Sequence, residues 1–312
     1  MIGAWSMVFN SMSSNSCRQA AKRLFSTMPN PSPLVAVCQM TSTGDKEKNF
    51  QVVRDLVLEA KRKQACMAFL PECCDYVGEN IIDTVTMSEP QSGPTIVKYK
   101  NLALENNIWL SFGGVHERES NDSEKISNTH ILIDNQGVLV ASYRKIHLFD
   151  MENKDTGIRL KESSYVNRGN KIIPPIITPI GKLGLSICYD MRFPELSLTL
   201  RNNGAEILTF PSAFTYQTGA SHWEILLRAR AIETQCYVIA AAQTGTHNKK
   251  RTSWGHAMIV DPWGTIIAQC SNKIGVAIGE IDLELLNRIR KNMPSENHRR
   301  IDLYPSMNIL NQ

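Results

Sequence analysis

The chain has 312 residues, of which 42% are hydrophobic, and a formal net charge of +4 at pH 7. This length and composition predict one large domain with a sizeable core, and no apolar run approaches the roughly 20 residues that a membrane helix needs. Residues 1–33 hold three cations and no Asp or Glu, so the rest of the chain carries only +1. A basic surface for nucleic acid in the folded part is therefore not indicated.

The opening segment is rich in Ser and Met and carries Arg18, Lys22 and Arg23 towards its end. This composition is typical of a mitochondrial transit peptide, and Arg23–Ser26 resembles a processing site. The alternative is a disordered tail. Translation from Met28 would give a cytosolic form, so we expect a mitochondrial and cytoplasmic protein with a leader over 1–33. The folded domain is expected over 34–312, ending in a tail.

Strand and helix patterns alternate through the first half of the chain. Short apolar runs predict strands, and apolar residues at helical spacing predict helices. A turn at Asp134–Gly137 predicts a hairpin. Strands are predicted at 34–40, 66–70, 108–115, 129–133 and 138–143, helices at 46–64 and 94–106, and a polar loop at 150–171.

The second half repeats the alternation but contains another hairpin, with its turn at Asp261–Gly264. Hairpins do not belong to a simple doubly wound parallel sheet, so the pattern predicts two sheets packed face to face with helices outside. Strands are predicted at 183–187, 205–210, 237–242, 257–260 and 265–268, with a last strand ending at 281, and helices at 194–203 and 221–235, with a basic helix near the end.

Eight cysteines are present, several of them inside apolar runs where they fit as small core residues. There is no CxxC pair and no HExxH or CxxH spacing, so a zinc site is not indicated. Free thiols rather than a disulfide framework suggest a reducing environment.

One cysteine stands apart, because Cys188 ends an apolar run and is followed at once by polar residues. Pro194 and Glu195 then suit the first turn of a helix. Cys188 is therefore predicted on a strand-to-helix elbow, where a helix amino terminus helps to hold a thiolate. We interpret it as a nucleophile.

A thiol that attacks an amide needs a base and a group that stabilises the oxyanion. Glu72 follows a buried strand, where partial desolvation would raise the pKa of a general base; the alternative is a loop acid that faces water. Lys145 follows a hairpin strand and would place an ammonium beside the tetrahedral intermediate. Because Arg144 and Lys145 are adjacent, one of them must face elsewhere, and a solvated strand end is the alternative for Lys145.

Two further residues are candidates with weaker local signals. Glu162 lies in the polar loop and would orient the lysine or a water molecule. Arg192 would bind a substrate carboxylate, or instead form an ion pair with Glu195 or Asp190.

Three stretches resemble motifs of the carbon–nitrogen hydrolase (nitrilase) superfamily and occur in that family's order: Phe69–Glu72, Tyr143–Leu148 and Cys188–Leu196. The resemblance extends over residues 34–305. It implies an α/β fold, a four-layer αββα sandwich, with a Glu72–Lys145–Cys188 triad. Glu162 matches the family's second glutamate. The resemblance also implies no cofactor and at least a homodimer.

Residues 232–243 and 260–264 are similar to the branch of this family that acts on deaminated glutathione. This implies hydrolysis of its 2-oxoglutaramyl amide to 2-oxoglutarate and cysteinylglycine through a thioester on Cys188. Lys145 and the backbone N–H of Tyr189 would hold the oxyanion, and Tyr189 and Arg192 would contact the substrate. The alternative is an ω-amidase acting on 2-oxoglutaramate, or another amide or carbamoyl hydrolase.

Two rival hypotheses come from other classes. A Cys–His hydrolase would use His147 or His222 as its base. A non-catalytic interaction module would keep the fold without turnover.

Overall fold

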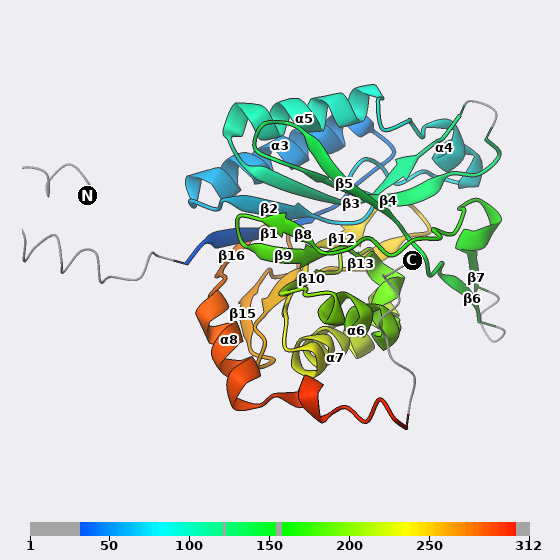
Figure 1. Cartoon of the computed structure of the whole chain (residues 1–312). Coiled ribbons are helices and arrows are strands. Elements are labelled where there is room, and N and C mark those ends of the chain that lie inside the picture. The colour runs from blue at the N-terminus through cyan, green and yellow to red at the C-terminus, as the bar shows by residue number, and fades with distance from the viewer. Residues whose placement is uncertain (1–31, 121–122, 154–157, 304–312) are drawn as a thin grey trace, which may run out of the picture. The chain divides into compact units, whose positions relative to one another are not determined.

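Two mixed β-sheets pack face to face with helices on their outer faces, which confirms the expected four-layer αββα sandwich (Figure 1). The computed structural model describes residues 32–120, 123–153 and 158–303. Apart from its last two residues, the predicted leader over 1–33 lies outside the described residues, as does the end of the predicted tail.

The first sheet has the order β13-β12-β1-β2-β3-β4-β5, and β16 pairs antiparallel with β1. Its centre is parallel, because β1 pairs in parallel with β12 and β2, and β2 with β3. Its strands are β1 (Leu34–Met40), β2 (Met67–Leu70), β3 (Trp109–Glu117), β4 (Ser127–Ile133), β5 (Leu139–Arg144), β12 (Ala242–Thr246), β13 (Thr252–Trp254) and β16 (Gly275–Glu280).

The second sheet has the order β15-β14-β11-β10-β9-β8, with a parallel centre of β9, β10 and β11. Its strands are β8 (Ile176–Thr178), β9 (Gly181–Gly184), β10 (Ile207–Thr209), β11 (Tyr237–Ala240), β14 (Met258–Val260) and β15 (Ile266–Gln269).

Helices α3 and α5 cover the outer face of the first sheet, and α6 and α7 cover that of the second (Figure 1). The helices are α3 (Lys46–Arg62), α4 (Ile81–Thr86), α5 (Pro94–Asn106), α6 (Pro194–Asn202), α7 (Tyr216–Thr234) and α8 (Leu283–Asn292), with short 3-10 helices η1 (Glu162–Ser164), η2 (Cys188–Arg192) and η3 (Ser295–His298).

Strand β1 shows why the sandwich forms. Val35 and Val37 point into the core between the sheets, whereas Ala36, Cys38 and Met40 pack under α3 and α5. A strand that is apolar on both faces must be covered on both faces. The continuous apolar run of the sequence therefore places β1 in the interior of the sandwich.

The structure corrects several predicted elements. The predicted loop 150–171 contains a small hairpin of β6 (Asp150–Asn153) and β7 (Ile158–Lys161), followed by η1. The predicted strand 183–187 is in the sheet only to Gly184. Helix α7 begins at Tyr216, five residues early, because Thr215 caps it.

The predicted strand 237–242 is also wrong in one respect, because it divides at Ala241. Strand β11 belongs to the second sheet, and β12, which follows directly, belongs to the first. The local sequence is apolar on both sides of the break, so only the pairing partners reveal that the chain changes sheets.

Gly113 on β3 of the first sheet lies against Pro211, which follows a strand of the second sheet. A Cβ atom built on it would lie 1.9 Å from Cβ and 2.2 Å from Cγ of Pro211, which follows β10 in the second sheet. Pro211 also accepts a hydrogen bond from the Cys188 amide at 3.0 Å. The absent side chain at Gly113 therefore permits the contact that supports the elbow.

We expect Gly113→Ala to lower the free energy of unfolding by about 1–3 kcal/mol, because the new methyl group must displace the proline ring. Chemical denaturation measures the change. Gly275→Ala is the matched control, since no atom lies within 4 Å of its built Cβ. Equal stability of the two variants would contradict the steric argument.

Candidate active site

Three predicted residues come together where strands of both sheets end. Glu72 follows β2, Lys145 follows β5, and Cys188 opens η2 beyond β9. Lys145 Nζ lies 3.0 Å from Glu72 Oε1, and the Cys188 thiol and the Glu72 carboxylate are close enough for each to shift the pKa of the other. The exposed fractions of Glu72, Lys145 and Cys188 are only 4%, 2% and 9%. Glu72 is thus no solvent-facing loop acid, and Lys145 no solvated strand end.

Glu162 joins the same cluster. Its two carboxylate oxygens lie 3.0 and 2.9 Å from Lys145 Nζ. The β6–β7 hairpin and η1 place it there, and the Phe149 amide donates to its Oε2 at 2.7 Å. The adjacent Arg144 points away and forms an ion pair with Glu117, as the alternation of a strand requires.

Two groups that the sequence analysis did not single out hold the Glu72 carboxylate. The Asn128 side-chain amide donates to Oε1 at 2.9 Å, and the Ala213 backbone amide donates to Oε2 at 2.9 Å. Asn128 belongs to the polar first half of β4, which reads Ser-Asn-Thr-His before three apolar residues, and this polar run in a predicted strand was the available signal. Nothing in the local sequence marks the amide of Ala213.

The elbow differs from the predicted strand-to-α-helix turn. Cys188 has a positive φ of 45° and begins the 3-10 helix η2, whereas α6 starts only at Pro194. The nucleophile therefore does not lie at the amino terminus of an α-helix. Pro194 does occupy the first turn of α6, as predicted.

Asp190 organises the elbow from inside. Its side chain is fully buried and accepts hydrogen bonds from the Tyr143 hydroxyl at 2.8 Å, from the Ile187 amide at 2.9 Å, and from the amide and Nδ1 of His147 at 3.1 and 2.8 Å. Tyr143 is in the first sheet, so this carboxylate links the sheets beside the nucleophile. From sequence, Asp190 was considered only as a partner for Arg192.

The predicted pKa shift of Glu72 is wrong in direction. Burial would raise the pKa of this carboxyl group, but the cations of Lys145 and Arg251 outweigh it and lower the pKa to about 2. Arg251 was not singled out from sequence. It follows the pair Lys249 and Lys250, lies between β12 and β13, and places Nη2 3.9 Å from Cys73 Sγ.

The expected help of an α-helix amino terminus in holding a thiolate at Cys188 is not found. Burial raises the pKa of the Cys188 thiol well above its usual range, and the negative charge of Glu72 adds to this effect. The cation of Lys145 acts in the opposite direction but does not outweigh them. Burial acts to lower the pKa of Lys145, but Glu162 and Glu72 raise it. The resting site therefore holds a neutral thiol, two carboxylates and an ammonium.

Tyr189 and Arg192 lie on the outer side of the elbow. The Arg192 guanidinium carbon is 5.8 Å from the centre of the Tyr189 ring and 5.5 Å from that of Phe214. Its Nη2 donates to His222 Nδ1 at 3.2 Å. Within the described ranges it forms no ion pair with Glu195 or Asp190, so the alternative suggested for Arg192 is wrong.

The two histidines of the rival Cys–His scheme are engaged elsewhere. His147 is bonded to Asp190 and stacks on Phe193 with ring centres 3.7 Å apart. His222 is bonded to Arg192 on the exposed side. The charged groups that shift the pKa of the Cys188 thiol are Glu72 and Lys145, and neither histidine is among them.

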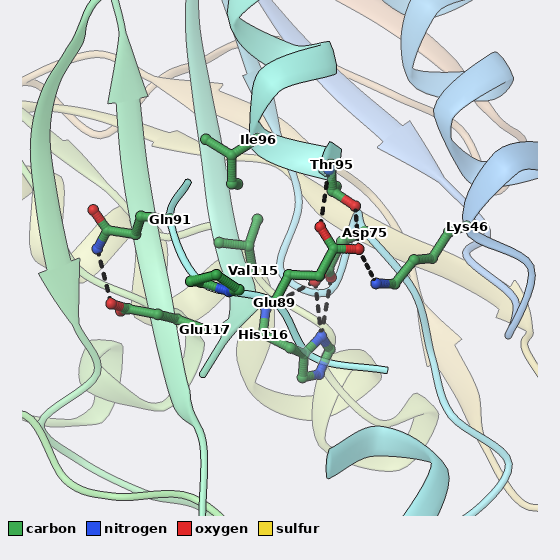
Figure 2. A pocket seen from close by; sticks show the side chains of 10 residues that line it. Lys46, Asp75, Glu89, Gln91, Thr95, Ile96, Val115, His116 and Glu117 are labelled. Atoms are coloured by element: carbon green, nitrogen blue, oxygen red, sulfur yellow. Dashed lines mark hydrogen bonds and ion pairs between the residues drawn. The ribbon is translucent and has the colours of Figure 1, made fainter. Parts of the chain in front are cut away.

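A polar pocket between α5 and β3 is separate from this cluster (Figure 2). In it Asp75 binds His116 at 3.0 Å, and Glu89 pairs with Lys46 and accepts from Thr95. The charged groups that line it are paired, Asp75 and Glu89 within the pocket and Glu117 with Arg144 beside it. The His116 amide also donates to Asp75 Oδ2 at 2.8 Å, so the pocket supports the loop that follows Glu72.

Comparison with known proteins places this geometry in a family. The family model described as "Carbon-nitrogen hydrolase" matches residues 34–291. The chain belongs to the carbon–nitrogen hydrolase family. This carbon–nitrogen hydrolase is 54% identical over 277 residues to the deaminated glutathione amidase of Mus musculus, which covers 88% of this chain and 85% of that protein.

Solved structures of similar proteins support the assignment of this chain to the carbon–nitrogen hydrolase family. The Caenorhabditis elegans NitFhit protein matches with a TM-score of 0.84 and 51% identity over 90% of this chain and 68% of that one. Saccharomyces cerevisiae Nit3, a member of branch 10 of the nitrilase superfamily, matches with a TM-score of 0.76 and 30% identity over 87% and 97%.

Membership of this family assigns the chain to enzymes that hydrolyse carbon–nitrogen bonds. Every helix in the described ranges is too short or too polar to cross a membrane.

We expect Arg251→Gln to move the acid limb of the kcat/KM profile to higher pH, because it removes one of the two cations that lower the pKa of Glu72. By the same linkage, the contribution of ionised Glu72 to stability is fully present above pH 4.5 and is lost as pH falls towards 2. Rates measured from pH 3 to 8 test the shift. Arg228→Gln, on the exposed side of α7, is the control, and an unchanged acid limb in Arg251→Gln would refute the electrostatic account.

Proposed function

We propose that this carbon–nitrogen hydrolase hydrolyses the 2-oxoglutaramyl amide of deaminated glutathione to 2-oxoglutarate and cysteinylglycine. The buried cluster of Glu72, Lys145 and Cys188 carries the proposal, because it provides a base, a cation and a thiol within one site. The mouse relative, a deaminated glutathione amidase with 54% identity, supports this substrate.

The proposed first step is attack with coupled proton transfer. Glu72 accepts the thiol proton while Cys188 Sγ forms a bond to the amide carbonyl carbon. Because the thiol is neutral at rest and Glu72 is already ionised, the base is ready and the thiolate develops only during attack. Lys145 and the backbone N–H of Tyr189 donate to the oxygen, which becomes an oxyanion.

The second half returns the enzyme to its resting state. The carbon–nitrogen bond breaks as Glu72 gives its proton to the leaving amine of cysteinylglycine, which leaves a thioester on Cys188. Glu72 then takes a proton from water, whose oxygen attacks the thioester. The acyl–sulfur bond breaks, Cys188 regains its proton, and 2-oxoglutarate leaves. Glu162 keeps Lys145 oriented in both halves, and the scheme uses no cofactor.

Two chemical measurements test this proposal. Intact-protein mass spectrometry under turnover should show an acyl adduct that is absent in Cys188→Ala, and that variant should lose activity by several orders of magnitude because it has no nucleophile. In a competition assay, deaminated glutathione should have a higher kcat/KM than 2-oxoglutaramate, a carbamoyl β-amino acid and an aliphatic nitrile.

The two measurements test different parts of the proposal. A Cys188→Ala variant with retained activity would falsify the thioester scheme. If 2-oxoglutaramate or another amide is the better substrate and still forms the adduct, the thioester scheme stands and the proposed substrate is wrong. No turnover of any of the four would favour the non-catalytic module.

Arg192 is our candidate for a substrate carboxylate. Its guanidinium is half-buried beside Tyr189, and its partners there are aromatic rings and a histidine rather than an acid. An unneutralised guanidinium is suited to bidentate binding of a carboxylate.

We therefore expect Arg192→Gln to raise KM for deaminated glutathione by about tenfold or more, with a smaller effect on kcat, because one charge-assisted contact is lost. Steady-state kinetics measure both constants. Arg201→Gln on α6 is the control, since Arg201 binds the Thr234 carbonyl instead. An unchanged KM in Arg192→Gln would exclude this role.

We also infer that the chain forms at least a homodimer. Ile225 and Ile232, two turns apart on α7, are 69% and 48% exposed, and the neighbouring turn carries Trp263, which is 61% exposed. Gly264 of that turn contacts Ile232, so these apolar side chains lie on one surface. Light scattering gives the test, and a monomeric mass at micromolar concentration would refute the inference.

For residues 1–33 we propose a mitochondrial transit peptide, with a cytosolic form translated from Met28. The acid-free composition supports this. A fluorescent protein fused to residues 1–33 should enter mitochondria; a fusion that stays in the cytosol would exclude the targeting role.

A further inference from the structure

Asn128 contacts three charged residues of the active site. Its Nδ2 donates to Oε1 of Glu72 at 2.9 Å and to Oε1 of Glu162 at 3.1 Å. Its backbone carbonyl accepts from the amide of Lys145 at 2.9 Å. A single neutral residue on β4 thus connects both carboxylates and the strand end that carries the ammonium.

The Asn128 side chain is oriented so that its amide nitrogen binds the two glutamates, although its own oxygen is then left without a partner. Its Oδ1 is buried and has no hydrogen-bond partner among the described residues. Turning the amide over would place that oxygen against two carboxylate oxygens, which also only accept hydrogen bonds. The carboxylates therefore dictate the orientation, and the carbonyl is left unpaired, which is normally unfavourable in a protein interior.

The backbone opposite Asn128 is adapted to this arrangement. Gly114 on β3 has a positive φ of 68°, and a Cβ atom built on it would lie 2.6 Å from Asn128 Oδ1 and 2.7 Å from Glu72 Cγ. Only glycine leaves room for both side chains and adopts this φ without strain. Gly114 also accepts the hydrogen bond of the Cys73 amide, beside Glu72.

The charges explain why the bridging residue is an amide. Glu72 and Glu162 share the ammonium of Lys145, so these three groups have a net charge of −1 and the carboxylates repel each other. A neutral donor draws both Oε1 atoms together without changing the charge of the site. An acid of the same shape would supply an acceptor and a further negative charge.

We propose that Asn128 is a positioning residue for the reaction: it fixes the Glu72 carboxylate through Oε1, in register with Glu162, so that Glu72 faces the Cys188 thiol as an ionised base. This rests on the proposed role of Glu72 but not on the identity of the substrate. Asn128 itself has no part in bond making.

The main test is Asn128→Asp, which keeps the shape and replaces the donor by a negative charge. Misplacement of a catalytic group by about 1 Å costs about 100-fold in rate, so we expect kcat to fall about 100-fold with KM changed less than about threefold. The acid limb of the pH profile should move to higher pH, because the added charge disfavours ionised Glu72. Asn128→Ala, which only removes the donor, should give a smaller shift in the same direction.

A readout that needs no substrate accompanies the kinetics. The rate at which iodoacetamide alkylates Cys188, followed by peptide mass spectrometry against pH, reports proton removal from the thiol by Glu72. It should fall in both Asn128 variants. Asn202→Asp is the matched control, because Asn202 at the end of α6 also has a buried, unpartnered Oδ1 but no bond to the cluster.

The outcomes separate the two proposals. Unchanged kcat, pH profile and alkylation in the Asn128 variants would overturn the positioning role, and so would a loss that Asn202→Asp reproduces. If Asn128→Asp does not fold, the Asn128→Ala variant decides by the same criteria. If the wild-type protein does not cleave deaminated glutathione, the proposed substrate fails, while the alkylation rates still test Asn128.

Discussion

A buried ammonium between two carboxylates is the constraint on which the site depends. Lys145 is 2% exposed, and a buried cation is tolerated only when opposite charges and hydrogen bonds replace water. Removing one partner of such a pair typically costs about 3–5 kcal/mol. Glu72 and Glu162 meet this need from different segments of the chain, so the pairing that allows burial also assembles the base beside the thiol.

The same pairing determines which groups of the site carry a proton at rest. A thiol buried beside a carboxylate keeps its proton, and a carboxylate buried beside cations loses its own. The nucleophile is therefore activated only when Glu72 removes its proton as an electrophilic carbon approaches. A resting thiolate would be open to any electrophile or oxidant that entered the site.

The sequence predicted the parts of the site that depend on local pattern. Glu72 and Lys145 follow apolar strands and Cys188 ends an apolar run, and three motifs in family order identified the fold. It did not predict Asn128, Asp190 or Arg251 in their roles, because each acts through partners distant in the chain. The pKa of Glu72 was predicted in the wrong direction for the same reason: desolvation can be inferred from a strand, but the neighbouring cations cannot.

The passage of the chain between sheets at Ala241 has a consequence for how activity is lost. Just beyond it, Gln243 donates to the backbone carbonyl of Glu72 and to Ser42, while its own amide bonds Ser212, which follows the second sheet. The backbone under the base is thus held by segments from both sheets. The sandwich cannot open without moving Glu72, so the catalytic geometry and the global fold form one cooperative unit, and heat should inactivate and unfold the enzyme in a single transition.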